Sequence, residues 1–197
     1  MFFKLTNTAA SAISCLLLAG LLASCSEQGT TSAPAAAGDA PAAAVRASVP
    51  AEAQFKAAAD TAEALKAMTQ TGACSLENVV NMADNSLNPG DVPNSYKVGT
   101  GNAYKMIGFA TNVDAGTVPK TIRIVLSGAQ VYSIDSVTGS ERPDVATFFK
   151  KPALANAGYQ ADAAFDDVAP GEYSVLLIET DGPAPIACPT HQTITIK

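Results

Sequence analysis

Alternating apolar and polar positions mark a series of short strands in the C-terminal two-thirds of the chain. Between residues 121 and 126, Ile122, Ile124 and Leu126 alternate with Thr121, Arg123 and Val125. This period of two is typical of a strand with one buried face. Similar runs of β-branched and aromatic residues predict seven strands in all, over residues 76–82, 104–111, 121–126, 130–135, 158–165, 173–179 and 192–196.

Turn-forming residues separate these runs, for example Asn88-Pro89-Gly90 and Pro170-Gly171. Many short strands with turns between them favour a mainly β chain with a single antiparallel β-sandwich, immunoglobulin-like, over residues 72–197. One helical turn is expected to interrupt the strands, because Pro143 suits a first helical position and residues 144–149 continue from it.

A different pattern precedes the strands. Residues 51–70 are rich in Ala, Glu, Lys, Leu and Met, which are strong helix formers. We therefore predict one helix over residues 51–71, ended by Gly72. Its apolar positions, spaced as on one helix face, are Phe55, Ala58, Ala62, Leu65 and Met68. The helix is expected to lie on the domain, with binding of a partner or of a second copy as the alternative.

The N-terminus has the features of a targeting segment. Lys4 precedes an apolar stretch around residues 16–22 that is short for a bilayer span and suited to a signal-peptide core. The stretch ends in Leu22-Ala23-Ser24-Cys25, which resembles the lipobox of bacterial lipoproteins. That resemblance implies a signal peptide over residues 1–24 and acylation of Cys25. An ordinary secretory signal with an incidental Cys is the alternative.

The residues around the predicted cleavage site bear on location. Ser26, rather than Asp, follows the Cys, which resembles the sorting pattern for the outer membrane of Gram-negative bacteria. Residues 25–50 are dominated by Ala, Pro, Ser, Thr and Gly, so they are expected to form a flexible linker. We therefore expect a chain anchored to the membrane through lipid and located in the bacterial cell envelope, facing either the periplasm or the medium.

Charge and cysteine content limit the available chemistry. The net charge of −6 argues against a nucleic-acid partner, because such binding needs clustered Lys and Arg. In an exported chain, Cys74 and Cys188 are expected to form a disulfide, since Cys15 lies in the signal peptide and Cys25 carries lipid. A redox or metal pair is the alternative, but there is no CxxC motif and His191 is the one His. No metal or cofactor is expected.

Catalytic patterns are weak in this sequence. His191 could act as a base, yet no G-x-S-x-G motif frames a nucleophile for it. Carboxylates for a hydrolase are present at Asp162, Asp166-Asp167, Glu179 and Asp181, without a specific motif. The five Tyr residues are expected mainly to pack in the core rather than to form a sugar-stacking surface.

The second half of the chain carries a set of landmarks, which are Gly108-Phe109-Ala110, Arg142-Pro143-Asp144-Val145-Ala146, Asn156-Ala157-Gly158-Tyr159 and Pro170-Gly171-Glu172-Tyr173-Ser174-Val175. They resemble a β-sandwich domain of bacterial envelope proteins that is appended to membrane glycosyltransferase-like proteins. The resemblance implies a fold and no settled activity.

These landmarks also supply a candidate ligand site. Arg142, Asp144, Asn156 and Tyr159 could converge on a polar ligand such as a glycan. In the structural alternative, Asp144 favours a helix N-terminus and pairs with Arg142, while Gly158 allows a close backbone approach. The expected function is a noncatalytic, lipid-anchored module that binds or scaffolds a glycan or protein of the envelope. The alternatives are a carboxylate-dependent envelope hydrolase, or a structural accessory subunit that acts through the helix over 51–71.

Overall fold

The computed structural model of this chain describes residues 50–197. The predicted signal peptide over 1–24, the acylation site at Cys25 and the linker up to residue 49 lie outside the described residues. None of the described helices has the length and apolarity that a membrane-spanning helix requires.

Strands account for most of the regular structure, which confirms the prediction of a mainly β chain. Each of the seven predicted strands is present, while β1, β2 and β4 were not predicted. In chain order the elements are η1 (Ala51–Ala53), β1 (Lys56–Ala57), α1 (Ala62–Ala67), β2 (Thr69–Gln70), β3 (Ala73–Asn81), β4 (Ser95–Val98), β5 (Ala103–Thr111), β6 (Thr121–Ser127), β7 (Val131–Ser140), α2 (Pro143–Phe148), η2 (Pro152–Leu154), β8 (Gly158–Ala164), β9 (Gly171–Glu179) and β10 (Ile186–Ile196).

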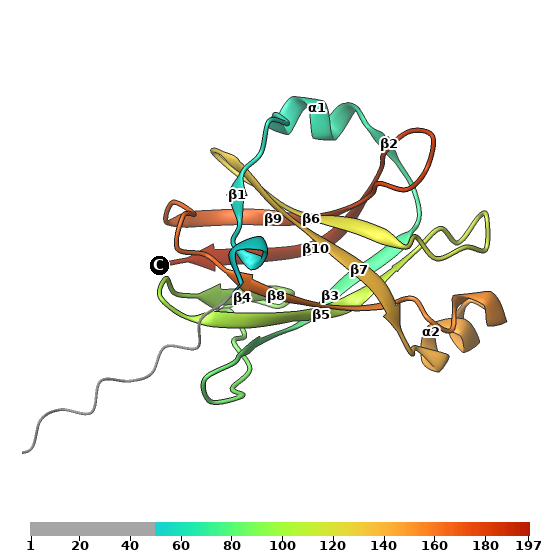
Figure 1. Cartoon of the computed structure of the whole chain (residues 1–197), viewed down its shortest axis with the longest axis horizontal. Coiled ribbons are helices and arrows are strands. Elements are labelled where there is room, and N and C mark those ends of the chain that lie inside the picture. The colour runs from blue at the N-terminus through green and yellow to red at the C-terminus, as the bar shows by residue number, and fades with distance from the viewer. Residues whose placement is uncertain (1–49) are drawn as a thin grey trace, which may run out of the picture. The chain divides into compact units, whose positions relative to one another are not determined.

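The strands form one curled sheet in the order β2-β10-β9-β6-β7-β8-β5-β3. The long strands pair in antiparallel fashion, whereas the short strands β2 and β4 both join β10 in parallel. Strand β7 links the two halves of the sheet, because it pairs with β6 over most of its length and with β8 at its end. Figure 1 shows β7 running obliquely from one half to the other.

Side chains and a disulfide join β3 to β10, where the sheet curls round on itself. Cys74 on β3 is bonded to Cys188 on β10, so the predicted disulfide is confirmed. Farther along, Gln192 Oε1 accepts a hydrogen bond from Leu76 N at 3.3 Å. Tyr96 Oη of β4 donates to the carbonyl oxygen of Leu76 at 3.0 Å. These contacts hold β3 and β10 together, because no continuous ladder of backbone hydrogen bonds joins the two strands.

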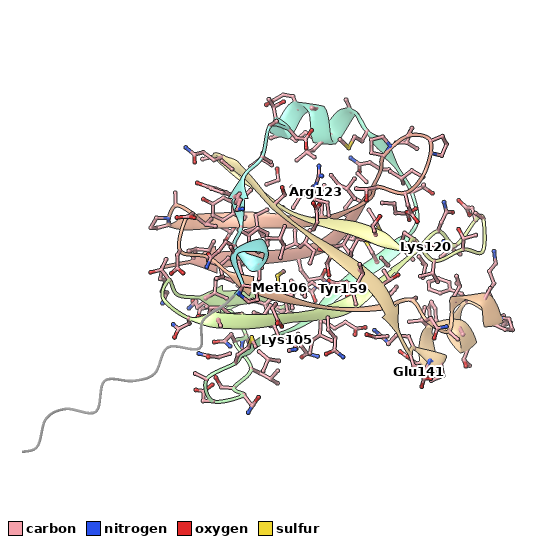
Figure 2. All side chains as sticks on the ribbon, viewed as in Figure 1. Lys105, Met106, Lys120, Arg123, Glu141 and Tyr159 are labelled. Carbon is pink, nitrogen blue, oxygen red and sulfur yellow. A yellow bond between two sulfur atoms is a disulfide. The ribbon has the colours of Figure 1, made fainter. Side chains whose placement is uncertain are left out.

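The main core fills the inside of the curl. Ile122, Ile124 and Leu126 are fully buried there, as their spacing predicted. Met106 and Tyr159 lie in the middle of the molecule in Figure 2, and both are fully buried. The core also contains three further tyrosines, which confirms that the Tyr residues mainly pack inside; these are Tyr104, Tyr132 and Tyr173.

The prediction of one helix over 51–71 is wrong in extent. Helix α1 covers Ala62–Ala67 alone, and strand β1 before it pairs with β7. Phe55 N donates to the carbonyl oxygen of Ala164 at 3.1 Å, and its ring stacks on Phe165 inside the core, with ring centroids 5.0 Å apart. We call residues 50–71 the N-terminal strap, because they run from β8 across to β7 and then over the outer face of the sheet.

Burial on two different faces explains why the longer helix does not form. Phe55 enters the inner core, whereas Leu65 packs on the outer face of the sheet against Val125 and Ile178. One straight helix cannot place both side chains in this way. The helix propensity of the segment is a weaker preference than these tertiary contacts. Helix α1 begins where Thr61 Oγ1 accepts a hydrogen bond from Ala64 N at 3.1 Å.

Candidate functional site

Helix α2 and the 3-10 helix η2 project from one end of the sheet (Figure 1). We call residues 142–156 the α2 lobe. As predicted, Pro143 begins the helix, and Asp144 lies in its first turn. The underside of the lobe is apolar, because Val145 and Leu154 are buried against Phe109 of β5.

Arg142 joins this lobe to the sheet. Its Nε and Nη2 donate to the carboxylate of Asp144 at 2.9 and 2.6 Å, and its Nη1 and Nη2 donate to Glu77 of β3 at 2.8 and 2.9 Å. The guanidinium also lies over the ring of Phe109, 5.2 Å from its centroid. The Arg142 side chain is 18 % exposed. Its donors are therefore largely satisfied within the protein.

The positive charge of Arg142 is fully compensated by the carboxylates of Asp144 and Glu77. The hydrogen bond from Arg142 lowers the pKa of Asp144 to about 2. The same bond, together with those to Glu77, raises the pKa of Arg142 above its usual value. Both groups are thus held in their charged forms as a salt bridge, which leaves the guanidinium little capacity to bind an external anion.

The other two predicted site residues do not join Arg142 and Asp144 in one pocket. Tyr159 is fully buried, its hydroxyl donates to the carbonyl oxygen of Ser75 at 3.1 Å, and burial raises its pKa. Asn156 is exposed on the lobe surface. The landmarks thus fit the structural alternative. A Cβ on Gly158 would lie 2.8 Å from the carbonyl oxygen of Ser140, which explains the glycine there.

Glu77 was missed by sequence reasoning. It is separated from Arg142 by 65 residues, and no local pattern links a carboxylate on one strand to an arginine at a distant helix N-terminus. The alternation of β3 could have predicted that Glu77 lies on the outer face. It could not have identified Arg142 as the partner of Glu77.

An apolar surface covers the outside of the α2 lobe. Phe148 is 79 % exposed, and its ring stands edge-on to Phe149, with centroids 4.9 Å apart. A shallow, mainly apolar groove of about 460 Å³ lies on the lobe, lined by Pro143, Ala146, Thr147, Lys150, Pro152 and Ala155. Aromatic residues, Phe included, are enriched in protein–protein interfaces relative to the rest of the surface.

The carboxylates proposed for hydrolysis are dispersed in the structure. Asp162 forms an ion pair with Lys105 at 3.2 Å, and Asp166 accepts a hydrogen bond from Gly101 N at 2.5 Å. Burial, with a smaller effect from Asp181, raises the pKa of Glu179. None of the grooves described here is lined by Glu179. Within residues 50–197, no group of three or more His, Cys, Asp and Glu residues is arranged to hold a metal ion.

No protein-family model, curated protein or solved structure matches this chain. What the α2 lobe does is therefore inferred from its own geometry.

Proposed function

We propose that this chain is a noncatalytic, lipid-anchored protein of the bacterial cell envelope, and that it binds a protein partner through the α2 lobe. The observation that carries the proposal is the exposed ring of Phe148 on a lobe that Arg142 fastens to the sheet. Burial of a large apolar side chain at an interface contributes about 1.5–3 kcal/mol, which makes Phe148 the natural anchor.

The lobe is better suited to a protein than to a glycan. Glycan recognition uses free polar donors and acceptors, but Arg142 and Asp144 bond to each other, and Arg142 also bonds to Glu77. The hydroxyl of Tyr159 is buried. The outer surface of the lobe instead offers an aromatic ring and a mainly apolar groove, which match the composition of protein interface centres.

The membrane anchor is proposed from the residues 22–25, which resemble a lipobox, and the outer membrane from Ser26. The disulfide between Cys74 and Cys188 supports an oxidising compartment, since such bonds are rare in the cytosol. Two or three acyl chains would give stable attachment. We therefore propose the membrane as one partner, bound through the lipid anchor. Nucleic acid is not proposed as a partner.

We further infer that the two halves of the curled sheet act as the two layers of an antiparallel, immunoglobulin-like sandwich. In support, β5, β3 and β8 form one half, β6, β9 and β10 form the other, and the main core lies between them.

The partner is tested by photo-crosslinking in the native host envelope. A photoreactive phenylalanine analogue is placed at position 148, and, as a matched control, at Val137, which is 63 % exposed on β7. We expect a crosslink to one protein species from position 148 and not from 137. The same crosslinked species from both positions, or crosslinks from 148 to lipid alone, would contradict a protein partner at the lobe.

The anchor is tested separately. Cys25→Ala should abolish incorporation of labelled palmitate and release the protein from the membrane fraction. Cys15→Ala is the control, because that residue lies within the predicted signal peptide. Palmitate that persists in Cys25→Ala would contradict acylation at this residue.

A further inference from the structure

A second groove lies on the outer face of the sheet beside helix α1, on strands β6, β9 and β10. It encloses about 400 Å³, within the size range of small-molecule sites. We call it the α1 groove. In Figure 1, α1 lies on a different side of the molecule from the α2 lobe. A ligand here would therefore be bound independently of the proposed protein partner.

Three hydroxyl side chains cross the floor of this groove in one row. Ser127 of β6 pairs with Ser174 of β9, which pairs with Thr193 of β10. Neighbouring strands are about 4.8 Å apart, so the hydroxyls are spaced at roughly that interval. In the described part of the chain none of the three side chains has a hydrogen-bond partner. They form a polar strip that can donate to and accept from a ligand.

A distortion of β10 brings His191 to the edge of this strip. The ladder with β9 shifts between Pro189 and Thr193, and His191 has a left-handed backbone with φ of 61°. Thr190 Oγ1 holds the bulge by donating to the carbonyl oxygen of Val175 at 2.7 Å. A non-glycine residue in this region is strained, and such bulges often direct a side chain toward a functional site.

The charge of the groove is opposite to that of the whole chain. Lys66 of α1 lines it, and no Asp or Glu does, although the chain carries a net charge of −6. None of the carboxylate side chains that the structure describes forms an ion pair with Lys66. The lining thus offers one uncompensated ammonium group, together with the imidazole of His191, to an incoming anion.

Leu176 of β9 and Pro189 of β10 form an apolar wall of the groove. The side-chain amides of Gln70 and Gln192 also line it. A pyranose ring presents C–H bonds on its faces and hydroxyls around its rim, so it can pack against such a wall while its hydroxyls reach the row of Ser127, Ser174 and Thr193. The ammonium of Lys66 then matches a carboxylate on the ring.

We propose that the α1 groove binds a saccharide that carries a carboxylate. Each part of this ligand class has its counterpart on the protein. The row of hydroxyls matches the sugar hydroxyls, the apolar wall matches the ring face, and Lys66 matches the carboxylate. A neutral sugar lacks the contact with Lys66. A simple carboxylate lacks the contacts with the hydroxyl row and with the apolar wall.

His191 provides a direct readout, because it is the one histidine in the chain. The probe is D-glucuronate, added to the full chain in detergent micelles while the Cε1–H resonance of His191 is followed by NMR. We expect a saturable shift with a Kd in the range of about 1 mM. D-glucose should bind about tenfold more weakly, because it cannot make the charge-assisted contact with Lys66. Acetate should bind more weakly still.

Variants locate the site. Lys66→Met should weaken glucuronate binding about tenfold and leave the weak glucose binding unchanged. Ser174→Val should weaken both sugars, because the central hydroxyl is lost. The matched controls are Lys120→Met, which directly precedes β6 and is labelled in Figure 2, and Ser136→Val on β7; neither should alter binding.

Four outcomes would overturn the proposal. They are the absence of a shift at about 50 mM glucuronate, equal affinity for glucose and glucuronate, equal affinity for acetate and glucuronate, and unchanged affinity in both Lys66→Met and Ser174→Val. Tighter binding of glucose 6-phosphate than of glucuronate would overturn the assignment of the anion as a carboxylate. Isothermal titration of the same variants gives an independent measure of each Kd.

Discussion

Arg142 and Glu77 form two parallel N–H···O bonds of 2.8 and 2.9 Å across 65 residues of sequence. This fork is the link between the N-terminus of α2 and the outer face of β3. Because the planar guanidinium also covers the ring of Phe109, the link has a defined orientation as well as a defined length.

Replacement of Arg142 by Lys keeps the charge and removes the fork. We expect the free energy of unfolding to fall by about 1–3 kcal/mol, because hydrogen bonds between charged groups are lost at a largely covered site. Urea unfolding measures this loss. Arg123→Lys is the matched control, since its pair with Asp135 is more exposed and should contribute under about 1 kcal/mol. Equal losses in the two variants would show that the fork has no special role.

The disulfide between Cys74 and Cys188 closes a loop with a sequence separation of 114. The Cys74→Ser/Cys188→Ser variant should lose up to about 4–5 kcal/mol of stability, because the unfolded chain regains that loop entropy. The urea midpoint of the variant should match that of the parent chain with the bond reduced. If the urea midpoint of the variant equals that of the parent chain with the disulfide intact, the side-chain contacts of Gln192 and Tyr96 are enough to hold β3 and β10 together.

Gly108 of β5 lies close to the backbone of β3. A Cβ at this position would overlap the carbonyl oxygen of Ser75 and come within 2.7 Å of the hydroxyl oxygen of Tyr159. Gly108→Ala should therefore lower the free energy of unfolding by at least about 2 kcal/mol. In Gly182→Ala the nearest atom would be 3.4 Å away, so that control should change stability by less than about 0.5 kcal/mol. Thermal unfolding of the two variants distinguishes these expectations.

Glu179 should make stability depend on pH. Burial raises its pKa above the usual 4.5, so its protonated form is favoured in the folded chain. The stability that it contributes is complete below about pH 4.5 and is lost as the pH rises through the raised pKa. Glu179→Gln should therefore raise the melting temperature at pH 7 and have little effect at pH 4. The exposed Glu172→Gln is the control, and an equal gain at both pH values in Glu179→Gln would contradict this explanation.

The strands were predictable because a buried face repeats every two residues. In β6, that pattern alone predicts which side chains point inward, namely Ile122, Ile124 and Leu126. Val125 faces the other way and is also buried, under Leu65 of α1, which no alternation within β6 indicates. Strand β4 escaped prediction because it has four residues and pairs in parallel with a strand nearly 100 residues later.

The candidate sites were less predictable, because they depend on contacts between distant segments. Arg142 and Asp144 were found as neighbours in sequence, whereas Glu77 comes from another strand. The row of Ser127, Ser174 and Thr193 depends on the register of three strands, which the composition of each strand leaves open.

The N-terminal strap has a mechanical consequence. A pulling force applied at Pro50 acts first on β1 and α1, which few backbone hydrogen bonds hold to the sheet. It then acts on the disulfide at Cys74. Pulling should release the strap as roughly 80 Å of extended chain before the sheet yields. In a single-molecule experiment between Pro50 and Lys197 we expect one early step shorter than that length, because the folded strap already spans part of the distance. A longer first step would contradict it. The strap thus lets the domain extend toward its partner under tension while the α2 lobe stays folded. The α1 groove would lose the wall that Leu65 and Lys66 supply, so tension would also remove that site.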